Sequence, residues 1–206
     1  MTPPMNTSPN EPTFFQIFSN AFGRGVFPHQ MSWFLDLPGR GLIMSARTVA
    51  SRLPVNPDAH VMEVGPGSGY YSAAVARRVP AGTLALVDIQ PEMLEKASRR
   101  LRAAGITNFT THVPTSEVLP FGDATFDAMF MVTVFGEIEG RDAFLAEARR
   151  VLKPGGVLSI TEHHPDPDFE PKAAVAAHVE RFGFVVQSTV GWRWAYTLNA
   201  VRPAEG

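Results

Sequence analysis

The stretch VMEVGPGSGYY, from Val61 to Tyr71, decides how the rest of the chain is interpreted. An apolar run that carries a single acid, Glu63, leads into a loop that packs three glycines and a proline into the five residues Gly65 to Gly69. An apolar strand that passes into a glycine-rich turn is typical of an open α/β sheet, where the turn lets the backbone approach a bound ligand closely. The stretch therefore predicts a ligand-binding turn between a strand and a helix.

The chain after Val55 alternates short apolar runs with helical patterns, which is typical of βαβ units and a parallel sheet. The apolar runs predict strands at His60–Val64, Leu84–Asp88, Phe109–Val113, Phe126–Val132 and Val157–Thr161. Around Gly191 the tail is rich in β-branched and aromatic residues, which predicts two further, antiparallel strands. The expected fold class is therefore α/β, with a Rossmann-like, seven-stranded, mostly parallel sheet, helices on both faces and an antiparallel last strand.

Prolines and glycines mark where the intervening helices begin and end. Pro91 suits the first turn of a helix that stops at Gly105, and Pro171 opens another that stops at Gly183. Between them, the segment Lys153-Pro154-Gly155-Gly156 is predicted to close a helix whose apolar positions are Phe144, Leu145, Ala148, Val151 and Leu152. Open sheets of this kind bind ligands at the C-terminal ends of their strands, so site residues are expected there.

The residues before the first strand predict a separate helical segment. Residues 1–12 hold four prolines among polar residues, so we expect a disordered tail there. Residues 13–54 are expected to form an N-terminal helical cap, and residues 55–206 the ligand-binding domain. The last helix of the cap is stopped by Pro54, and its helically spaced apolar positions are Leu42, Ile43, Ala46, Val49, Ala50 and Leu53.

Composition excludes several classes of protein. The chain has 206 residues, 45% of them hydrophobic, which suits one substantial core and excludes a disordered or fibrous protein. A net charge of −2 and a pI of about 6.3 provide no general field that would recruit nucleic acid. Cysteine is absent, which excludes disulfides, thiolate metal sites and cysteine nucleophiles. No apolar run approaches the roughly 18 residues of a membrane span, and without a signal-peptide pattern we expect a cytoplasmic protein.

The glycine loop departs from the patterns that bind phosphates. A dinucleotide loop follows G-x-G-x-x-G, and Tyr70 stands here at the place of the third glycine. The carboxylate of Glu63 would repel a pyrophosphate but attract an ammonium group, and the Lys-Ser/Thr pair of a Walker loop is missing. Asp88, nineteen residues after Gly69, ends the second predicted strand, where an acid commonly accepts hydrogen bonds from ribose hydroxyls. These residues predict a ligand with a ribose, a cationic amine and no phosphate.

S-adenosylmethionine has these features, and the chain resembles the class I S-adenosylmethionine-dependent methyltransferases. Within that class it is similar to the small-molecule type, related to the ubiquinone/menaquinone methyltransferase superfamily. The resemblance covers roughly Pro54 to Arg202, and the motifs that carry it are, in order, VMEVGPGSG, LALVDIQPEML, EVLPFGDATFDAMF and FLAEARRVLKPGGVLSITE. It implies an enzyme that takes its methyl group from S-adenosylmethionine.

The resemblance also implies roles for individual residues. The methionine end of the cofactor would be held by Glu63 and by the loop residues Gly65, Pro66, Gly67, Ser68 and Gly69. Asp88 would bind the ribose hydroxyls, and Ile89 would lie against the adenine. Structural roles stay open beside these: the loop also suits a turn without a ligand, Asp88 suits a cap of the helix near Pro91, and Ile89 suits the core.

The sequence departs from the family after the third predicted strand. Relatives often carry Gly-Asp-Ala there, whereas this chain has Pro114-Thr115-Ser116, so the usual acid opposite the adenine amine is replaced by Thr115. The Thr115 hydroxyl and the Ser116 backbone would then recognise the adenine.

The catalytic candidates follow the fourth and fifth predicted strands or precede the sheet. His163 or His164, in EHHPDPDFE after the fifth strand, would contact the acceptor or act as a general base. A metal site is not expected there, because adjacent histidines on an extended chain point to opposite sides. His29, in the N-terminal loop, is a similar candidate, and Glu137, after the fourth strand, would orient an amine acceptor.

The acceptor is predicted only as a class. The segment MVTVFGE lacks the Asn/Asp-Pro-Pro-aromatic motif that similar enzymes use on amino groups of adenine or glutamine, and without cysteine no thiolate can promote methylation of pyrimidine C5. A small-molecule or lipid-like acceptor remains, with O-, N- and C-methylation all open and no nucleic-acid partner expected. The alternatives are a catalytically inactive methyltransferase-like binding or scaffold domain and, less favoured, a nucleotide-dependent oxidoreductase, which Tyr70 and Glu63 oppose.

Overall fold

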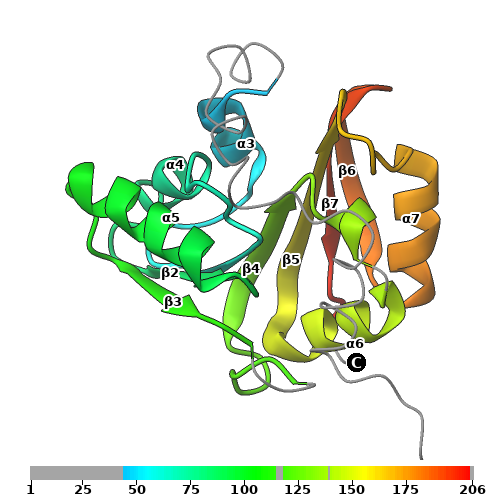
Figure 1. Ribbon diagram of the computed structural model, residues 1–206. Coiled ribbons are helices and arrows are strands. Elements are labelled where there is room, and N and C mark those ends of the chain that lie inside the picture. The colour runs from blue at the N-terminus through cyan, green and yellow to red at the C-terminus, as the bar shows by residue number, and fades with distance from the viewer. Residues whose placement is uncertain (1–43, 115–117, 139, 205–206) are drawn as a thin grey trace, which may run out of the picture.

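The computed structural model describes residues 44–204, apart from residues 115–117 and residue 139. These residues form a seven-stranded sheet in the order β3-β2-β1-β4-β5-β7-β6 (Figure 1). Its strands are β1 (His60–Val64), β2 (Thr83–Val87), β3 (Phe109–His112), β4 (Phe126–Val132), β5 (Leu152–His163), β6 (Val185–Trp192) and β7 (Ala195–Val201). Neighbouring strands are parallel except where β7 runs antiparallel to β5 and β6. The predicted fold class, with its antiparallel last strand, is confirmed.

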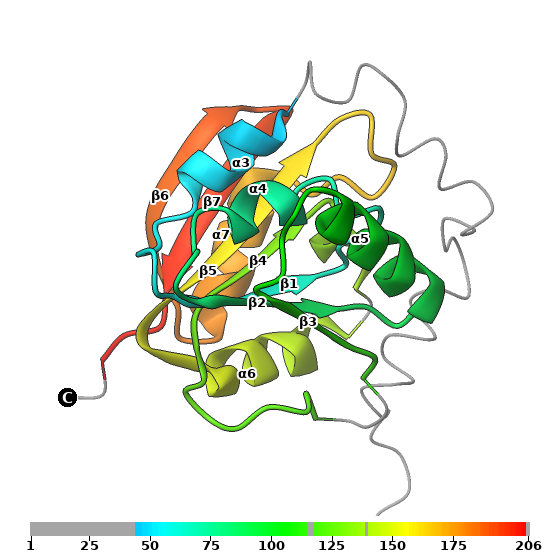
Figure 2. The same ribbon diagram turned by 90° about the vertical axis from the view of Figure 1, so that its left-hand side faces the viewer.

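Helices cover both faces of the sheet (Figures 1 and 2). They are α3 (Ala46–Arg52), α4 (Ser72–Ala76), α5 (Pro91–Ala103), α6 (Arg141–Val151) and α7 (Lys172–Arg181), with a short 3-10 helix η2 (Phe135–Glu137) after β4. Buried side chains of α3, α4 and α5 pack on one face, and those of α6 and α7 pack on the other. The sheet is thus the middle layer of three.

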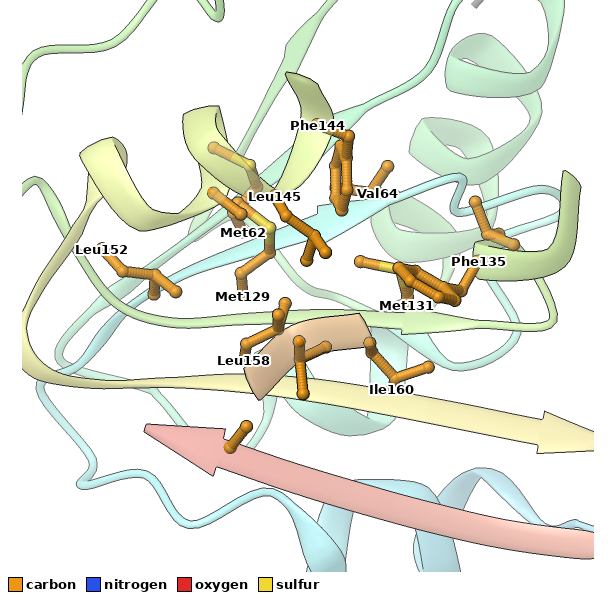
Figure 3. Close-up of a cluster of buried hydrophobic side chains, with 14 of the residues drawn as sticks. Met62, Val64, Met129, Met131, Phe135, Phe144, Leu145, Leu152, Leu158 and Ile160 are labelled. Atoms are coloured by element: carbon orange, nitrogen blue, oxygen red, sulfur yellow. The ribbon is translucent and has the colours of Figure 1, made fainter. Parts of the chain in front are cut away.

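The central strands are buried on both faces, which explains why they appear in the sequence as continuous apolar runs. Along β4, Met129 and Met131 point into the layer under α6 and α7, whereas Ala128 and Phe130 point toward α3, α4 and α5. Figure 3 shows the first of these layers, whose labelled side chains are Met62, Val64, Met129, Met131, Phe135, Phe144, Leu145, Leu152, Leu158 and Ile160.

Most predicted boundaries are confirmed, and the glycine stops have the expected geometry. Gly105 and Gly183 follow α5 and α7 with φ angles of 73° and 76°, the left-handed conformation that ends helices. The structure begins the last helix of the predicted cap at Ala46, because the Ser45 hydroxyl accepts a hydrogen bond from the Thr48 backbone N–H as an N-cap.

One predicted boundary, between the helix that contains Phe144 and Leu145 and the fifth predicted strand, is wrong. Leu152 was expected in the helix and Lys153 to Gly156 in a closing loop, but all five residues belong to β5. The backbone of Leu152 is extended, with φ −74° and ψ 140°, and Leu152 pairs with Phe126 of β4. The helical spacing of Leu152 therefore reflects a strand that begins immediately where α6 ends.

Several sequence predictions lie outside the described residues. These are the disordered tail 1–12, the part of the cap before Met44, His29, Thr115 and Ser116. In the part of the chain that is described, no helix is long and apolar enough to cross a membrane.

The strand order places a switch point between β1 and β4. From β1 the chain proceeds outward through β2 and β3 in one direction, and from β4 it proceeds to β5 in the other. Ligands of open α/β sheets bind beyond the C-terminal ends of the strands at such a point, where the two sets of connections diverge. The loop Gly65 to Gly69, which follows β1, lies at this position.

Candidate cofactor site

The glycine loop is tightly packed between β4 and α5. Gly65, Gly67 and Gly69 all have positive φ, at 66°, 53° and 76°. A Cβ atom on Gly65 would come within 2.6 Å of a Val134 methyl group, and one on Gly69 within 2.8 Å of the Ala97 Cα. All three glycines are therefore required by conformation, and Gly65 and Gly69 also by space, because Val134 and Ala97 occupy the room that a side chain would need.

Hydrogen bonds fix the loop to its neighbours. The Gly65 N–H donates to the Val87 carbonyl of β2 at 2.9 Å, and the Gly69 N–H donates to the Pro66 carbonyl at 2.9 Å. The buried Ser68 hydroxyl accepts from Arg100 of α5 at 3.0 Å. The loop conformation is thus held by β2 and α5. Asp88 lies in the short connection between these two elements.

Glu63 is a buried acid at the end of β1. It is 2% exposed and points to the face that α4 covers, as Val61 does two residues earlier. The pKa of Glu63 is raised to about 8, mainly by burial and also by the nearby Asp88 charge, while the Ser72 hydroxyl offsets part of the rise. Among the described residues, its Oε2 atom has no hydrogen-bond partner. A buried carboxylate oxygen of this kind is suited to a cationic ligand.

Asp88 follows β2 and faces the same loop. Its Oδ1 accepts a hydrogen bond from the Gln90 N–H at 2.9 Å, which closes a turn before α5. The N-cap of α5 is Gln90, without a side-chain hydrogen bond, so the capping role left open for Asp88 is not met. Burial raises the pKa of Asp88 to about 6, while the backbone N–H groups of Gln90, Gly67 and Ile89 lower it in part. Because Gly67 belongs to the glycine loop, Asp88 and Glu63 lie at one site.

These residues fit the ligand that the sequence predicts. Glu63 offers an orphaned carboxylate oxygen to a cation, Asp88 offers carboxylate oxygens to hydroxyl groups, and the glycine loop lies next to both. Ile89 is half-buried and packs against the apolar layer under α6 and α7. The sequence left open that Ile89 belongs to the core, and this contact agrees with that alternative.

Thr133 lies directly after β4, next to Val134, and sequence reasoning did not select it. It follows the last residue of β4 with a φ of 53°, which is rare for a β-branched residue. Its N–H donates to the Thr161 carbonyl of β5 at 2.8 Å, and its hydroxyl donates to the Val132 carbonyl. Strained backbone of this kind gathers at functional sites, and Val134 beyond it contacts Gly65 of the glycine loop.

The two adjacent histidines have different environments. His163, the last residue of β5, is 5% exposed and shares its sheet face with Thr161, which contacts Thr197 on the side of α3. Its Nδ1 donates to the His164 carbonyl at 3.2 Å, so in the neutral ring Nε2 carries the lone pair. His164 is exposed and stacks on Phe169 with ring centroids 4.2 Å apart.

Glu137 lies at the end of η2 and is half-buried. It lies near Glu162, whose pKa it helps to raise. Glu162 points to the face of α6 and α7, the face opposite to Glu63. The structure therefore brings Glu63 and Asp88 together at the glycine loop. His163 lies on the same face of the sheet as Glu63, whereas Glu137 lies toward the opposite face.

Glu162 is a buried acid that sequence reasoning did not select. It is 1% exposed, and burial raises its pKa to about 8, with the charges of Asp166 and Glu137 raising it further. The available signal was an acid inside an apolar strand, LSITE, the same signal that identified Glu63 in VMEV. Among the described residues, no group of three or more His, Asp or Glu side chains is arranged to hold a metal ion.

The fold and this site are those expected of a class I S-adenosylmethionine-dependent methyltransferase, and comparison with known proteins agrees. Residues 61–156 match the family model described as a methyltransferase domain, so this part of the chain is a methyltransferase domain. The resemblance inferred from the four motifs is therefore confirmed.

Curated relatives point to one branch of this class. The chain is 38% identical over 120 residues to the demethylmenaquinone methyltransferase of Tropheryma whipplei strain Twist, covering 58% of this chain and 48% of that protein. It is 36% identical over 130 residues to the ubiquinone/menaquinone biosynthesis C-methyltransferase UbiE of Bordetella avium, covering 62% of this chain and 50% of that protein. The chain thus spans about half the length of these relatives.

A solved structure shares the fold. The S-adenosylmethionine-dependent methyltransferase from Aquifex aeolicus superposes with a TM-score of 0.78 at 24% sequence identity, covering 86% of this chain and all of that one. At this identity the likeness concerns the fold alone.

Substituting Gly69 tests the close packing of the loop. We expect Gly69→Ala to lower the free energy of unfolding about 2 kcal/mol more than Gly105→Ala does, because overpacking adds to the strain of a positive φ. Both glycines have φ above 70°, but only a Cβ at position 69 would meet Ala97, and nothing lies within 4 Å of one at position 105. Urea unfolding measures both changes, and equal losses would contradict the packing argument.

Glu162 predicts a pH dependence of stability. Its pKa is raised from 4.5 to about 8 in the folded state, so between these values the unfolded chain ionises while the folded protein keeps the proton. Stability must then fall as pH rises through this window, by up to about 1.4 kcal/mol per pH unit from this residue. We expect Glu162→Gln to flatten the decline in urea-unfolding stability between about pH 5 and 8. Glu180→Gln, which neutralises an exposed acid of α7, is the control, and a parallel decline in both variants would refute the assignment.

Proposed function

We propose that this protein transfers a methyl group from S-adenosylmethionine to a carbon atom of a quinone-like, lipid-like small molecule. The observation that carries the proposal is the buried Glu63 carboxylate beside the glycine loop, with Asp88 facing the same loop. The acceptor class is taken from the relatives, whose names describe methylation of demethylmenaquinone and carbon methylation in ubiquinone and menaquinone biosynthesis.

Each site residue has a definite task in this proposal. Bound S-adenosylmethionine supplies a methyl group that is already activated on a positively charged sulfur. Glu63 and the glycine loop hold the methionine end, Asp88 holds the ribose hydroxyls, and the remaining predicted contacts to the adenine come from Ile89, Thr115 and Ser116. Because the reagent is activated, holding the acceptor carbon in line with the methyl group supplies much of the catalysis.

His163 is the residue that we propose as the general base. Methylation of a ring carbon is favoured when a ring hydroxyl gives its proton to a base, since the negative charge then spreads onto the ring carbon that attacks the methyl group. The hydrogen on that carbon leaves afterwards as a proton, which restores the aromatic ring. The lone pair of His163 lies on Nε2, because Nδ1 donates to the His164 carbonyl. His163 also lies on the same sheet face as Glu63. His164, His29 and Glu137 remain proposed contacts to the acceptor.

The two alternatives differ from this proposal in what they require. A nucleotide-dependent oxidoreductase needs a loop that accepts pyrophosphate, and the carboxylate of Glu63 opposes one. An inactive binding or scaffold domain would keep the cofactor site and lack turnover. The acceptor is proposed as a small molecule rather than a nucleic acid, and the cytoplasmic location stays a prediction of the sequence.

Turnover with defined acceptors tests the function. We expect S-adenosylhomocysteine release with short-tailed benzoquinols or naphthoquinols, with a new carbon–methyl bond in the product by mass spectrometry. Calorimetric binding of S-adenosylmethionine without turnover on quinols, phenols or amines would favour the inactive alternative. His163→Asn is expected to lower kcat while leaving cofactor binding unchanged, and an unchanged kcat would remove His163 as the base.

Glu63 predicts that cofactor affinity depends on pH. With a pKa of about 8, Glu63 is mostly neutral at pH 7, and a cationic ligand favours its ionised form, so binding releases a proton. Asp88, with a pKa of about 6, adds a smaller change at lower pH. Affinity for S-adenosylmethionine should therefore rise between about pH 6 and 8.

Glu63→Gln isolates this effect. We expect it to weaken binding by roughly tenfold to a hundredfold at pH 8, because a charge-assisted contact is lost, and to flatten the pH dependence. Isothermal titration calorimetry in buffers of different ionisation enthalpy measures both the affinity and the protons released. Glu92→Gln removes an exposed acid from the start of α5 as the control. Equal affinity in Glu63→Gln and the wild type would exclude Glu63 from the site.

A further inference from the structure

The hairpin between β6 and β7 exposes two tryptophans that the proposed site does not use. Trp192, the last residue of β6, is 75% exposed, and Trp194, in the turn, is 49% exposed. Val190, two residues before Trp192 on the same strand, is 47% exposed. Large indoles are usually buried or half-buried in folded proteins, so their exposure side by side at a hairpin tip calls for a function.

The position of this tip relates it to the cofactor site. β6 runs parallel to β5, since both are antiparallel to β7, so β6 ends at the sheet edge where β1, β4 and β5 also end. Figures 1 and 2 show the β6–β7 turn at this edge, close to the end of β5. The His164 N–H donates to the Trp194 carbonyl at 2.9 Å, which joins the tip to the loop that follows His163.

The chemistry of the tip suits a boundary between hydrocarbon and water. The exposed Arg193 guanidinium lies over the Trp194 ring, 4.8 Å from its centroid, and no carboxylate among the described residues pairs with it. An indole places its ring among acyl chains and its N–H among headgroups, and a guanidinium binds a lipid phosphate in the same layer. The sequence Trp-Arg-Trp at a protruding turn therefore presents both kinds of contact together.

The size of the tip argues against a protein partner. Its exposed apolar side chains are Val190, Trp192 and Trp194 on one narrow turn, whereas a stable protein interface buries about 800 Å² on each side. A lipid surface needs no complementary shape, so a few inserted aromatic side chains suffice for reversible binding.

We propose that Trp192, Arg193 and Trp194 dock the protein on a lipid bilayer, with the cofactor edge of the sheet next to the membrane. The inference rests on the proposed lipid-like acceptor, which such docking would deliver to the site from the bilayer. Asp166 and Asp168 lie in the loop beside the tip, so insertion of the indoles, and not attraction to anionic lipid, drives the binding. Binding should therefore occur on zwitterionic vesicles and persist at high salt.

Cosedimentation with phosphatidylcholine vesicles, and with phosphatidylcholine mixed with phosphatidylglycerol, tests the docking. We expect the wild-type chain to bind both, and Trp192→Ala and Trp194→Ala each to lower the partition coefficient by roughly tenfold, the equivalent of burying one aromatic side chain. Val185→Ser is the matched control, because Val185 is 55% exposed on the same strand but at its opposite end.

Other outcomes would overturn the proposal. Binding that is unchanged in both tryptophan variants, or absent in the wild type, excludes the tip as a membrane anchor. A dimer detected by analytical ultracentrifugation, lost in Trp192→Ala and without vesicle binding, would identify the tip as a contact between two copies. Turnover on a water-soluble quinol separates the membrane proposal from the proposed function. We expect equal turnover in the wild type and the tryptophan variants, because this substrate does not come from the bilayer. If none of these proteins turns it over, the proposed function is wrong, whereas the docking proposal still depends on the vesicle experiment.

Discussion

The site depends on one constraint, the burial of the Glu63 carboxyl group at the end of an otherwise apolar strand. An ionised carboxylate in this position is costly, and burial raises the pKa of Glu63 to about 8. Among the described residues Oε2 has no hydrogen-bond partner, which leaves it available to a cationic ligand. In the proposed cofactor complex a cation offsets the cost of this burial, so we expect Glu63 to favour positively charged ligands.

The close packing of the glycine loop ties the position of the Glu63 carboxylate to the rest of the fold. Gly65 leaves no room beside Val134 at the end of β4, and Gly69 leaves none beside Ala97 of α5. β1, β4 and α5 therefore meet at the loop, and a shift of any one of them would move the Glu63 carboxylate or the Asp88 that follows β2. The hydrogen bond from Arg100 to Ser68 adds a polar link between the same elements.

The sequence predicted those parts that local chemistry determines. β1 and β4 match the predicted bounds because parallel strands buried on both faces are continuous apolar runs, and Glu63 and Asp88 were found because acids interrupt or end such runs. The strain at Thr133 could not be predicted, since it arises from β4 meeting the glycine loop and β5 in space. Leu152 was misassigned because its position also satisfies the helical period of α6, and only pairing with Phe126 places it in the strand.

The antiparallel β7 has a consequence beyond sheet order. Strands that run parallel end at one edge, which is why residues from β1, β2 and β5 gather there although they are far apart in sequence. β6 ends at the same edge, and a parallel seventh strand would require a crossover that leads the chain away from it. Because β7 is antiparallel, the chain instead returns in a tight turn at that edge, and the turn presents Trp192 and Trp194 to solvent. The topology that brings the proposed cofactor residues together thus also determines which surface lies beside them.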